Sequence, residues 1–172
     1  GRAKSPLSNA AMHFSRTIGI FATLALLGAT AAADRASKDC PDCPETRTKG
    51  RAFDAFPLAK MDLKKMTCGS GQARKCLANE GAPLTLGGKT YTCGVGTHAP
   101  SRFEVALDGR GLAFTAVVGI DGEVAGEGSA EFLVYGDGRL LARSGVLRKS
   151  DGGRPLFADL AGVQVVELVV TD

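Results

Sequence analysis

His98 is the only histidine outside the first 33 residues, and it follows two glycines, Gly94 and Gly96, in a run that begins near Tyr91. Glycine lets the backbone approach a bound molecule closely, so this imidazole could hydrogen-bond a ligand. The alternative is a loop histidine bonded to nearby backbone. A catalytic triad would also need a nucleophile and an acid beside the imidazole, and the sequence gives no specific sign of either. We therefore predict His98 and Tyr91 as ligand-binding residues and no residue as catalytic.

Three acids, Asp121, Glu123 and Glu127, lie in a glycine-rich loop. Oxygen-rich loops can hold calcium, but these acids lack the regular spacing of an EF-hand loop. Solvated turn acids are the alternative, so we expect no cofactor beyond a structural calcium ion. Paired carboxylates can also cleave a glycosidic bond, yet the domain is far shorter than the roughly 250 residues of a barrel hydrolase. Asp121 and Glu123 are predicted as ligand-binding residues, the metal ligands stay unassigned, and an enzyme is not expected.

Five cysteines are present, and two of them, Cys40 and Cys43, form a C-x-x-C motif. The motif lacks the neighbouring βαβ pattern of a thioredoxin-like redox site. Pro44 follows it, where a haem attachment site has histidine. A thiol redox protein is therefore the least favoured function, and we interpret the motif as a local or intermolecular disulfide.

Cys68 and Cys76 bracket a short loop. We predict a disulfide between them, which would contribute about 2 to 3 kcal/mol by restricting the unfolded loop. Cys93 is then left over, and the sequence does not settle the pairing because geometry decides it. A zinc site that uses Cys68 and Cys76 is a further alternative, although the spacings match no common zinc pattern.

The N-terminal part is typical of a secretory signal peptide, which we assign to residues 12–33. A short basic start at Met12 precedes the apolar run Ile18–Leu27, and small residues suited to cleavage follow it. The apolar run is short for a membrane span, which needs about 20 residues. An uncleaved anchor is the alternative, but we expect no stable membrane span after cleavage and a secreted or periplasmic protein. Residues 1–11 lie upstream of this leader.

Residues 34–52 are polar and charged, and they are predicted to form a disordered linker because they cannot bury enough apolar surface. Residues 53–172 form the predicted folded domain. The net charge of the chain is +3, but the basic excess lies in residues 1–66, while the rest is slightly acidic. Nucleic acid is therefore not an expected partner.

The folded domain alternates short apolar strands with turn signals at spacings of about 8 to 12 residues, which is typical of a sandwich or barrel. Gly87-Gly88 predicts a hairpin between residues 84–86 and 89–91, and strict alternation over residues 102–107 predicts a half-buried strand. Further strands are expected at residues 112–120, 130–135, 139–144, 155–160 and 163–170. The last is apolar on both faces, so we expect neighbours and cover on both sides. The fold class is an all-β antiparallel β-sandwich.

Several blocks of sequence together resemble one known family. The runs Gly87–Tyr91 (GGKTY) and Gly94–Ala99 (GVGTHA) match its "GGKTY…GxGTHA" signature, and Phe114–Asp121 resembles its "FxAxVGxD" strand. Phe132–Gly138 resembles "FxVxGDG", and Leu168–Asp172 resembles "LxVTD". In this order, over residues 58–172, the blocks resemble the NPCBM family of carbohydrate-binding modules.

The resemblance implies a galactose-binding-like jelly-roll sandwich that binds carbohydrate, such as galactose-containing glycans, and accompanies a glycoside hydrolase. It places the sugar site near His98 and residues 121–127. Three departures stand out: Gly69-Ser70-Gly71 replaces the family's "GWG", Gly122 replaces its second acid, and the closing aromatic segment is not present, so we expect the domain to be incomplete at Asp172. The chain contains no tryptophan for stacking on a sugar. The alternative function is an envelope interaction or structural sandwich without sugar binding.

Overall fold

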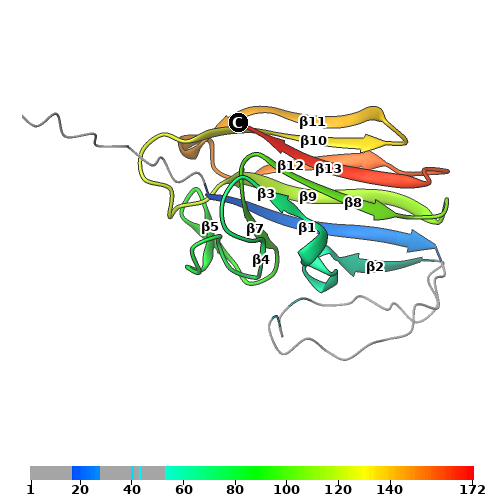
Figure 1. The fold of residues 1–172 in the computed structure, drawn as a ribbon, viewed down its shortest axis with the longest axis horizontal. Helices are drawn as coiled ribbons and strands as arrows, with labels where there is room; N and C mark the ends of the chain where they lie inside the picture. The colour runs from blue at the N-terminus through cyan, green and yellow to red at the C-terminus, as the bar shows by residue number, and fades with distance from the viewer. Residues whose placement is uncertain (1–16, 28–39, 41–42, 44–52) are drawn as a thin grey trace, which may run out of the picture.

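The structure is a computed structural model of the 172-residue chain, and it describes residues 17–27, 40, 43 and 53–172 (Figure 1). Strands dominate these residues, and the helical segments are three single turns: η1 (Leu58–Lys60), η2 (Leu63–Lys65) and η3 (Lys149–Asp151). The predicted all-β fold class is therefore confirmed. In the part of the chain that the structure describes, no helix is long and apolar enough to span a membrane.

Two antiparallel sheets and one hairpin make up the fold (Figure 1). The first sheet runs β12 (Arg154–Asp159), β9 (Gly111–Ile120), β1 (Thr17–Leu27), β7 (Val95–His98) and β4 (Arg74–Lys75), and β2 (Phe53–Pro57) also pairs with β1. The second runs β11 (Arg139–Arg148), β10 (Ser129–Gly136), β13 (Val165–Thr171), β8 (Ser101–Ala106) and β3 (Thr67–Cys68). β5 (Leu84–Leu86) and β6 (Lys89–Tyr91) form the separate hairpin.

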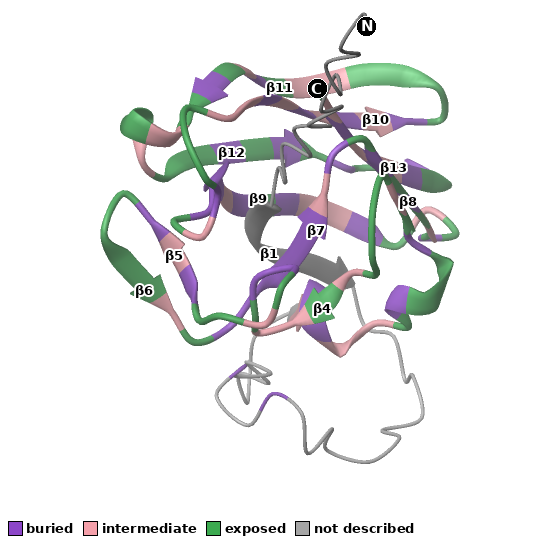
Figure 2. Cartoon of the chain, turned by 60° about the vertical axis from the view of Figure 1, so that its left-hand side comes forward, coloured by how far each residue is buried: buried purple, intermediate pink, exposed green. Residues whose placement is uncertain are grey.

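The core lies between the two sheets because alternate residues of each strand point inward. Phe114 and Val118 of β9 are buried in the same apolar cluster as Phe132 of β10 and Leu168 of β13. Figure 2 shows buried residues along β7 and β9, and exposed residues along β6. The arrangement is the β-sandwich that the spacing of strands and turns predicts.

The predicted hairpin at Gly87-Gly88 is confirmed, since β5 and β6 pair with Leu86 opposite Lys89. Both glycines have positive φ, 57° and 80°, as a tight turn of this kind requires. Nine strands, β5 to β13, lie between Leu84 and Thr171, one more than the eight predicted, because β7 was not expected to be a strand. β11 extends to Arg148 rather than ending at Ser144.

The final strand, β13, corrects one expectation. It has neighbours on both edges, β10 and β8, as predicted. Only one face is fully covered, however: Val166, Leu168 and Val170 are buried, whereas Val165 is 40% exposed. The apolar residues of the outer face follow from the strong β propensity of valine in a central strand rather than from a covering layer.

The apolar run of the predicted signal peptide lies in β1, which pairs with β9 on one side and with β7 and β2 on the other. Cleavage of this segment stays a prediction, and it would conflict with this pairing, because it would remove β1 from the first sheet. The remainder of the leader, the upstream residues 1–11 and all of the linker except Cys40 and Cys43 lie outside the described residues. Both of these cysteines are buried, so the expectation of an exposed linker is wrong at these two positions.

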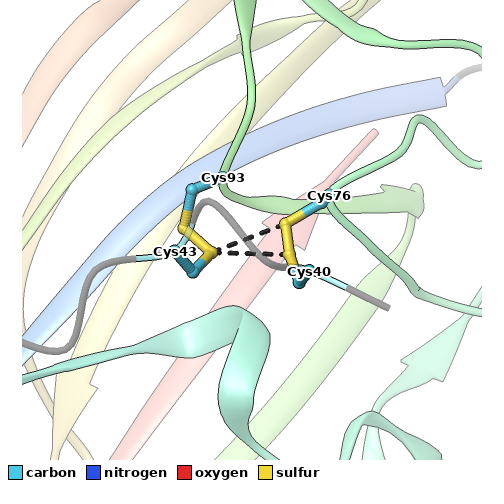
Figure 3. Close-up of a disulfide and its surroundings, with 4 residues drawn as sticks. All are labelled: Cys40, Cys43, Cys76 and Cys93. Atoms are coloured by element: carbon cyan, nitrogen blue, oxygen red, sulfur yellow. Dashed lines mark hydrogen bonds between the residues drawn. A yellow bond between two sulfur atoms is a disulfide. The ribbon is translucent and has the colours of Figure 1, made fainter. Parts of the chain in front are cut away.

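The cysteine pairing differs from the prediction. Disulfides join Cys40 to Cys76 and Cys43 to Cys93, with Cα atoms 5.8 and 5.0 Å apart (Figure 3). The predicted Cys68–Cys76 bridge and the local bridge within the C-x-x-C motif are therefore wrong. The reason is topological: Cys68 lies on β3 of the second sheet, while Cys76 follows β4 of the first, and its N–H donates to Gly94 at 2.9 Å.

Candidate functional site

The strand register brings two of the predicted site segments to the same end of the first sheet. β1 runs antiparallel to both β7 and β9, and it pairs Thr17 with His98 and Ile18 with Ile120. β7 and β9 are therefore parallel to each other, and their last residues, His98 and Ile120, lie at one edge of the sheet. With one strand between them, their backbones are about 10 Å apart.

Asp121, the residue after β9, is buried and 1% exposed. Its Oδ2 accepts the backbone N–H of Thr85 at 2.8 Å, and its Oδ1 accepts that of Glu123 at 2.9 Å. Burial raises the pKa of this carboxyl above its ordinary value, and the two backbone hydrogen bonds oppose that rise. Both oxygens are thus engaged within the protein, and the arrangement favours an anchor of the β5–β6 hairpin over a direct sugar ligand.

Glu123 is oriented differently from Asp121. Its Oε1 accepts the backbone N–H of Glu80 at 3.0 Å. Its Oε2 is buried and accepts no hydrogen bond from the described residues. A buried acceptor without a partner is uncommon in folded proteins, since it loses its hydration without replacement. Glu123 is therefore the member of this loop with unused acceptor capacity, and a ligand would reach its Oε2 only if the loop moved to expose it.

Asn79 is a second residue of this kind, and sequence reasoning did not identify it. It is 8% exposed, and its Oδ1 is buried with no hydrogen-bond partner among the described residues. Its backbone carbonyl accepts from Nε of Arg74 at 2.7 Å. Nothing in its sequence context distinguishes Asn79 from an ordinary loop asparagine, because its position depends on how the loop packs.

The loop that carries Asn79 lies directly against β7. A Cβ added at Gly96 would come within 2.7 Å of the Cα of Ala78, so only glycine permits this close approach. Gly96 is two residues before His98, and Asn79 is the residue after Ala78. The loop therefore lies beside the strand that ends at His98, and the Glu80–Glu123 hydrogen bond connects it to the loop after β9.

His98 and Tyr91, the other predicted site residues, are both half-buried. Nδ1 of His98 lies 2.6 Å from the carbonyl oxygen of Ala99, which matches the interpretation of a loop histidine bonded to backbone. Tyr91 lies on β6, where the ammonium of Lys89 is 5.1 Å from the centre of its ring. A Cβ added at Gly153 would lie 3.0 Å from the Tyr91 hydroxyl, so the ring reaches from the hairpin to the turn before β12.

Two surface hollows lie away from the predicted residues. One, of about 450 Å³, is lined by residues 62–64, 66, 71–73 and 75. The other, of about 500 Å³, lies on the outer face of the second sheet around Arg102 and Glu104. The phenylalanine Phe157 on β12 is 62% exposed. Sequence reasoning missed it, although the alternation in Arg154–Asp159 places it on the face opposite buried Leu156.

An antiparallel β-sandwich with polar groups gathered on loops at one end of a sheet is suited to ligand binding, because loops on a rigid scaffold carry binding residues. The sequence pattern of the NPCBM/NEW2 domain matches residues 55–172, more than half of the chain. The chain therefore belongs to the NPCBM family of carbohydrate-binding modules, and the predicted family resemblance is confirmed. The family is one of binding modules and not of catalytic domains.

Two curated relatives carry a similar segment. A protein of Renibacterium salmoninarum, provisionally named endo-alpha-N-acetylgalactosaminidase, is 40% identical over 91 residues, which are 53% of this chain and 6% of that protein. Alpha-1,3-galactosidase B of Akkermansia muciniphila is 32% identical over 95 residues, which are 54% of this chain and 12% of that protein. The chain thus spans a small part of the length of these relatives.

Solved structures of CBM51 modules share the fold. The CBM51 from Clostridium perfringens GH95, in complex with methyl-galactose, has a TM-score of 0.61 and 30% identity, and the match covers 67% of this chain and 85% of that one. The CBM51-2 and INT domains of Clostridium perfringens ZmpB, in complex with GlcNAc, have a TM-score of 0.61 and 30% identity over 69% of this chain and 29% of that one. The likeness supports the β-sandwich assignment.

Proposed function

We propose that residues 55–172 bind a terminal galactose or N-acetylhexosamine residue of a glycan. The observation that carries this proposal is the likeness to two CBM51 structures in complex with methyl-galactose and with GlcNAc. The family match adds support. The names of the curated relatives further support attachment to, or action beside, a glycoside hydrolase in a secreted or periplasmic protein.

The binding groups are proposed to lie on the loops at the end of β7 and β9. Glu123 Oε2 and Asn79 Oδ1 are acceptors without partners among the described residues, and they suit the hydroxyl donors of a sugar. His98 lies at the rim, where its imidazole would orient the ring. Asp121 holds the loop and does not contact sugar. Tyr91 lies on β6 of the hairpin beside this loop, where its ring would contact the outer part of a bound glycan.

Titration calorimetry with methyl-galactoside and with GlcNAc tests the proposal. His98→Ala and Glu123→Gln should each weaken sugar binding by about 5- to 150-fold, the loss that follows from a buried hydrogen bond left unmade. Glu127→Gln is the matched control, because Glu127 is exposed on the same loop. Equal binding by wild type, His98→Ala and Glu123→Gln would place the sugar elsewhere.

A glycan array separates this function from a structural or interaction role in the cell envelope. A sugar-binding module should retain galactose- or GlcNAc-terminated glycans above other sugars. A folded chain that retains no glycan at all would favour the structural role. The proposed site contains no calcium ion, because both carboxylate oxygens of Asp121 already accept backbone hydrogen bonds. Added EDTA is therefore expected to leave sugar binding unchanged.

A further inference from the structure

Four of the five cysteines have their sulfur atoms in one cluster (Figure 3). The Sγ of Cys43 lies 3.4 Å from that of Cys40 and 3.5 Å from that of Cys76, in addition to its own bridge to Cys93. The sulfurs of Cys40, Cys43 and Cys76 all lie within 4.8 Å of one another. The two disulfides thus lie against each other, with three of their sulfurs close enough together to bind one ion.

The backbone brings the four cysteines together from three segments. Cys40 and Cys43 lie three residues apart, and the N–H of Cys43 donates to the carbonyl of Cys40 at 3.5 Å, which closes a turn. Pairing of β4 with β7 then places Cys76 beside the segment that contains Cys93. Cys76 has a φ of 57°, an uncommon conformation for a residue other than glycine, which turns the chain directly after β4.

We propose that these four cysteines, in their reduced form, are a structural site for Zn²⁺. Four thiolates arranged tetrahedrally with Zn–S bonds of about 2.3 Å have their sulfurs about 3.8 Å apart. The contacts of 3.4 and 3.5 Å between the two bridges are close to that spacing. Cys93 joins the other three sulfurs through its bridge to Cys43, so reduction of both bridges and a movement of its side chain would complete a four-sulfur cage around one ion.

The surroundings fit a closed structural zinc site. Cys40, Cys43 and Cys93 are at most 4% exposed, and they belong to the apolar cluster of the core. The first ligand pair has the C-x₂-C spacing common in such sites. The second pair, Cys76 and Cys93, is separated in sequence by the β5–β6 hairpin. The pairing of β4 with β7 brings these two cysteines close together in place of a short sequence spacing.

The same sulfurs cannot form the two disulfides and bind zinc at the same time, because a zinc ligand must be a free thiolate. A dithiol reductant reduces each bridge by two electrons and two protons, yields two thiols and becomes a cyclic disulfide itself. Two equivalents therefore release all four cysteines. Binding of Zn²⁺ then displaces the thiol protons to solvent, because thiolate is the ligand. Zinc should accordingly slow reformation of both bridges.

The test uses the full chain, reduced and then equilibrated with Zn²⁺ or Co²⁺ without oxygen. Elemental analysis after removal of excess metal should find one zinc per chain. The cobalt form should show the intense visible bands of a tetrahedral thiolate site and a thiolate charge-transfer band. Cys68→Ser is the matched control, since Cys68 is the free cysteine of the described residues, and it should bind zinc as the wild type does.

Cys76→Ser and Cys93→Ser should each weaken zinc binding by more than about 100-fold. Loss of a residue that only orients a metal ligand weakens metal binding by at most about 100-fold, so a larger loss identifies a ligand. Because a ligand variant could fail to fold, the cobalt spectra of wild type and Cys68→Ser carry the decision, and disulfide mapping during reoxidation gives a second readout. Retention of no zinc by reduced wild type, a non-thiolate cobalt spectrum, or disulfides that reform equally fast with zinc present would each overturn the proposal. Sugar binding is not part of any of these readouts.

Discussion

The carboxylate of Asp121 and the backbone of Thr85 are joined by a 2.8 Å hydrogen bond that connects two segments 36 residues apart in the chain. The same carboxylate holds Glu123 through its other oxygen. One buried side chain thus fixes the β5–β6 hairpin against the loop after β9. The proposed sugar-binding loop depends on this anchor for its shape.

Asp121→Asn should lower the free energy of unfolding at neutral pH by about 1 to 3 kcal/mol. An amide presents one acceptor oxygen, so one of the two backbone N–H groups would face an NH₂ group and lose its partner. Urea denaturation measures the change. Asp108→Asn is the control, because Asp108 is an exposed turn residue. An equal effect of both substitutions would refute the anchoring role.

The pKa of Asp121, raised by burial, also predicts a pH dependence. The unfolded carboxyl titrates near its ordinary value of 3.8, and the folded one titrates higher. Between these two pKa values the folded state holds more protons, so the free energy of unfolding falls as pH rises through this window. Asp121→Asn should lack this component. Denaturation of both proteins from about pH 4 to pH 7 should show their stability difference shrinking as pH rises.

Gly96→Ala should lower the free energy of unfolding by about 1 to 3 kcal/mol or more, because the added methyl group meets the backbone of Ala78. Displacement of that loop should also weaken sugar binding through Asn79. Gly122→Ala is the control, since a Cβ there lies 3.5 Å from Thr85, an ordinary contact. A change within about 0.5 kcal/mol is expected for the control. Thermal unfolding compares the two variants.

Asn79→Ala should weaken sugar binding by about 5- to 150-fold if its unpartnered Oδ1 accepts from the ligand. Phe157→Ala tests the competing surface, because this exposed ring on β12 could stack on a sugar. We expect Phe157→Ala to bind sugar as the wild type does. If calorimetry shows weaker sugar binding by Phe157→Ala and unchanged binding by Asn79→Ala, the sugar site lies on the outer face of the first sheet.

Removal of residues 1–33 should destabilise the domain strongly, because β1 lies between β9 and β7 in the first sheet. Without it, both neighbours expose an unpaired edge, which promotes association between copies. Removal of residues 1–11, which end before β1, is the control. Light scattering and urea denaturation compare the two. An unchanged free energy of unfolding would show that cleavage of the predicted signal peptide leaves a complete sandwich.

Local patterns in the sequence predicted the strands and turns well, since alternation and turn glycines act over a few residues. Gly87-Gly88 predicted its hairpin, and the alternation over residues 102–107 predicted the half-buried strand found at Ser101–Ala106. The motif order also predicted the family. β7 was not predicted as a strand. The outer face of β13 was also predicted wrongly, because a central strand rich in valine has the same composition whether one face or both faces are covered.

Pairing and proximity, in contrast, were decided by the tertiary structure. The short loop between Cys68 and Cys76 suggested a bridge, yet Cys68 ends β3 of the second sheet and Cys76 follows β4 of the first. The partners of Cys40 and Cys43 are instead brought close by the pairing of β4 with β7. Asn79 became a candidate only through packing of its loop on Gly96. The sequence by itself thus determined the elements and the family, because those depend on local chemistry. Which side chains meet depended on sheet order, which arises from contacts between residues far apart in the chain.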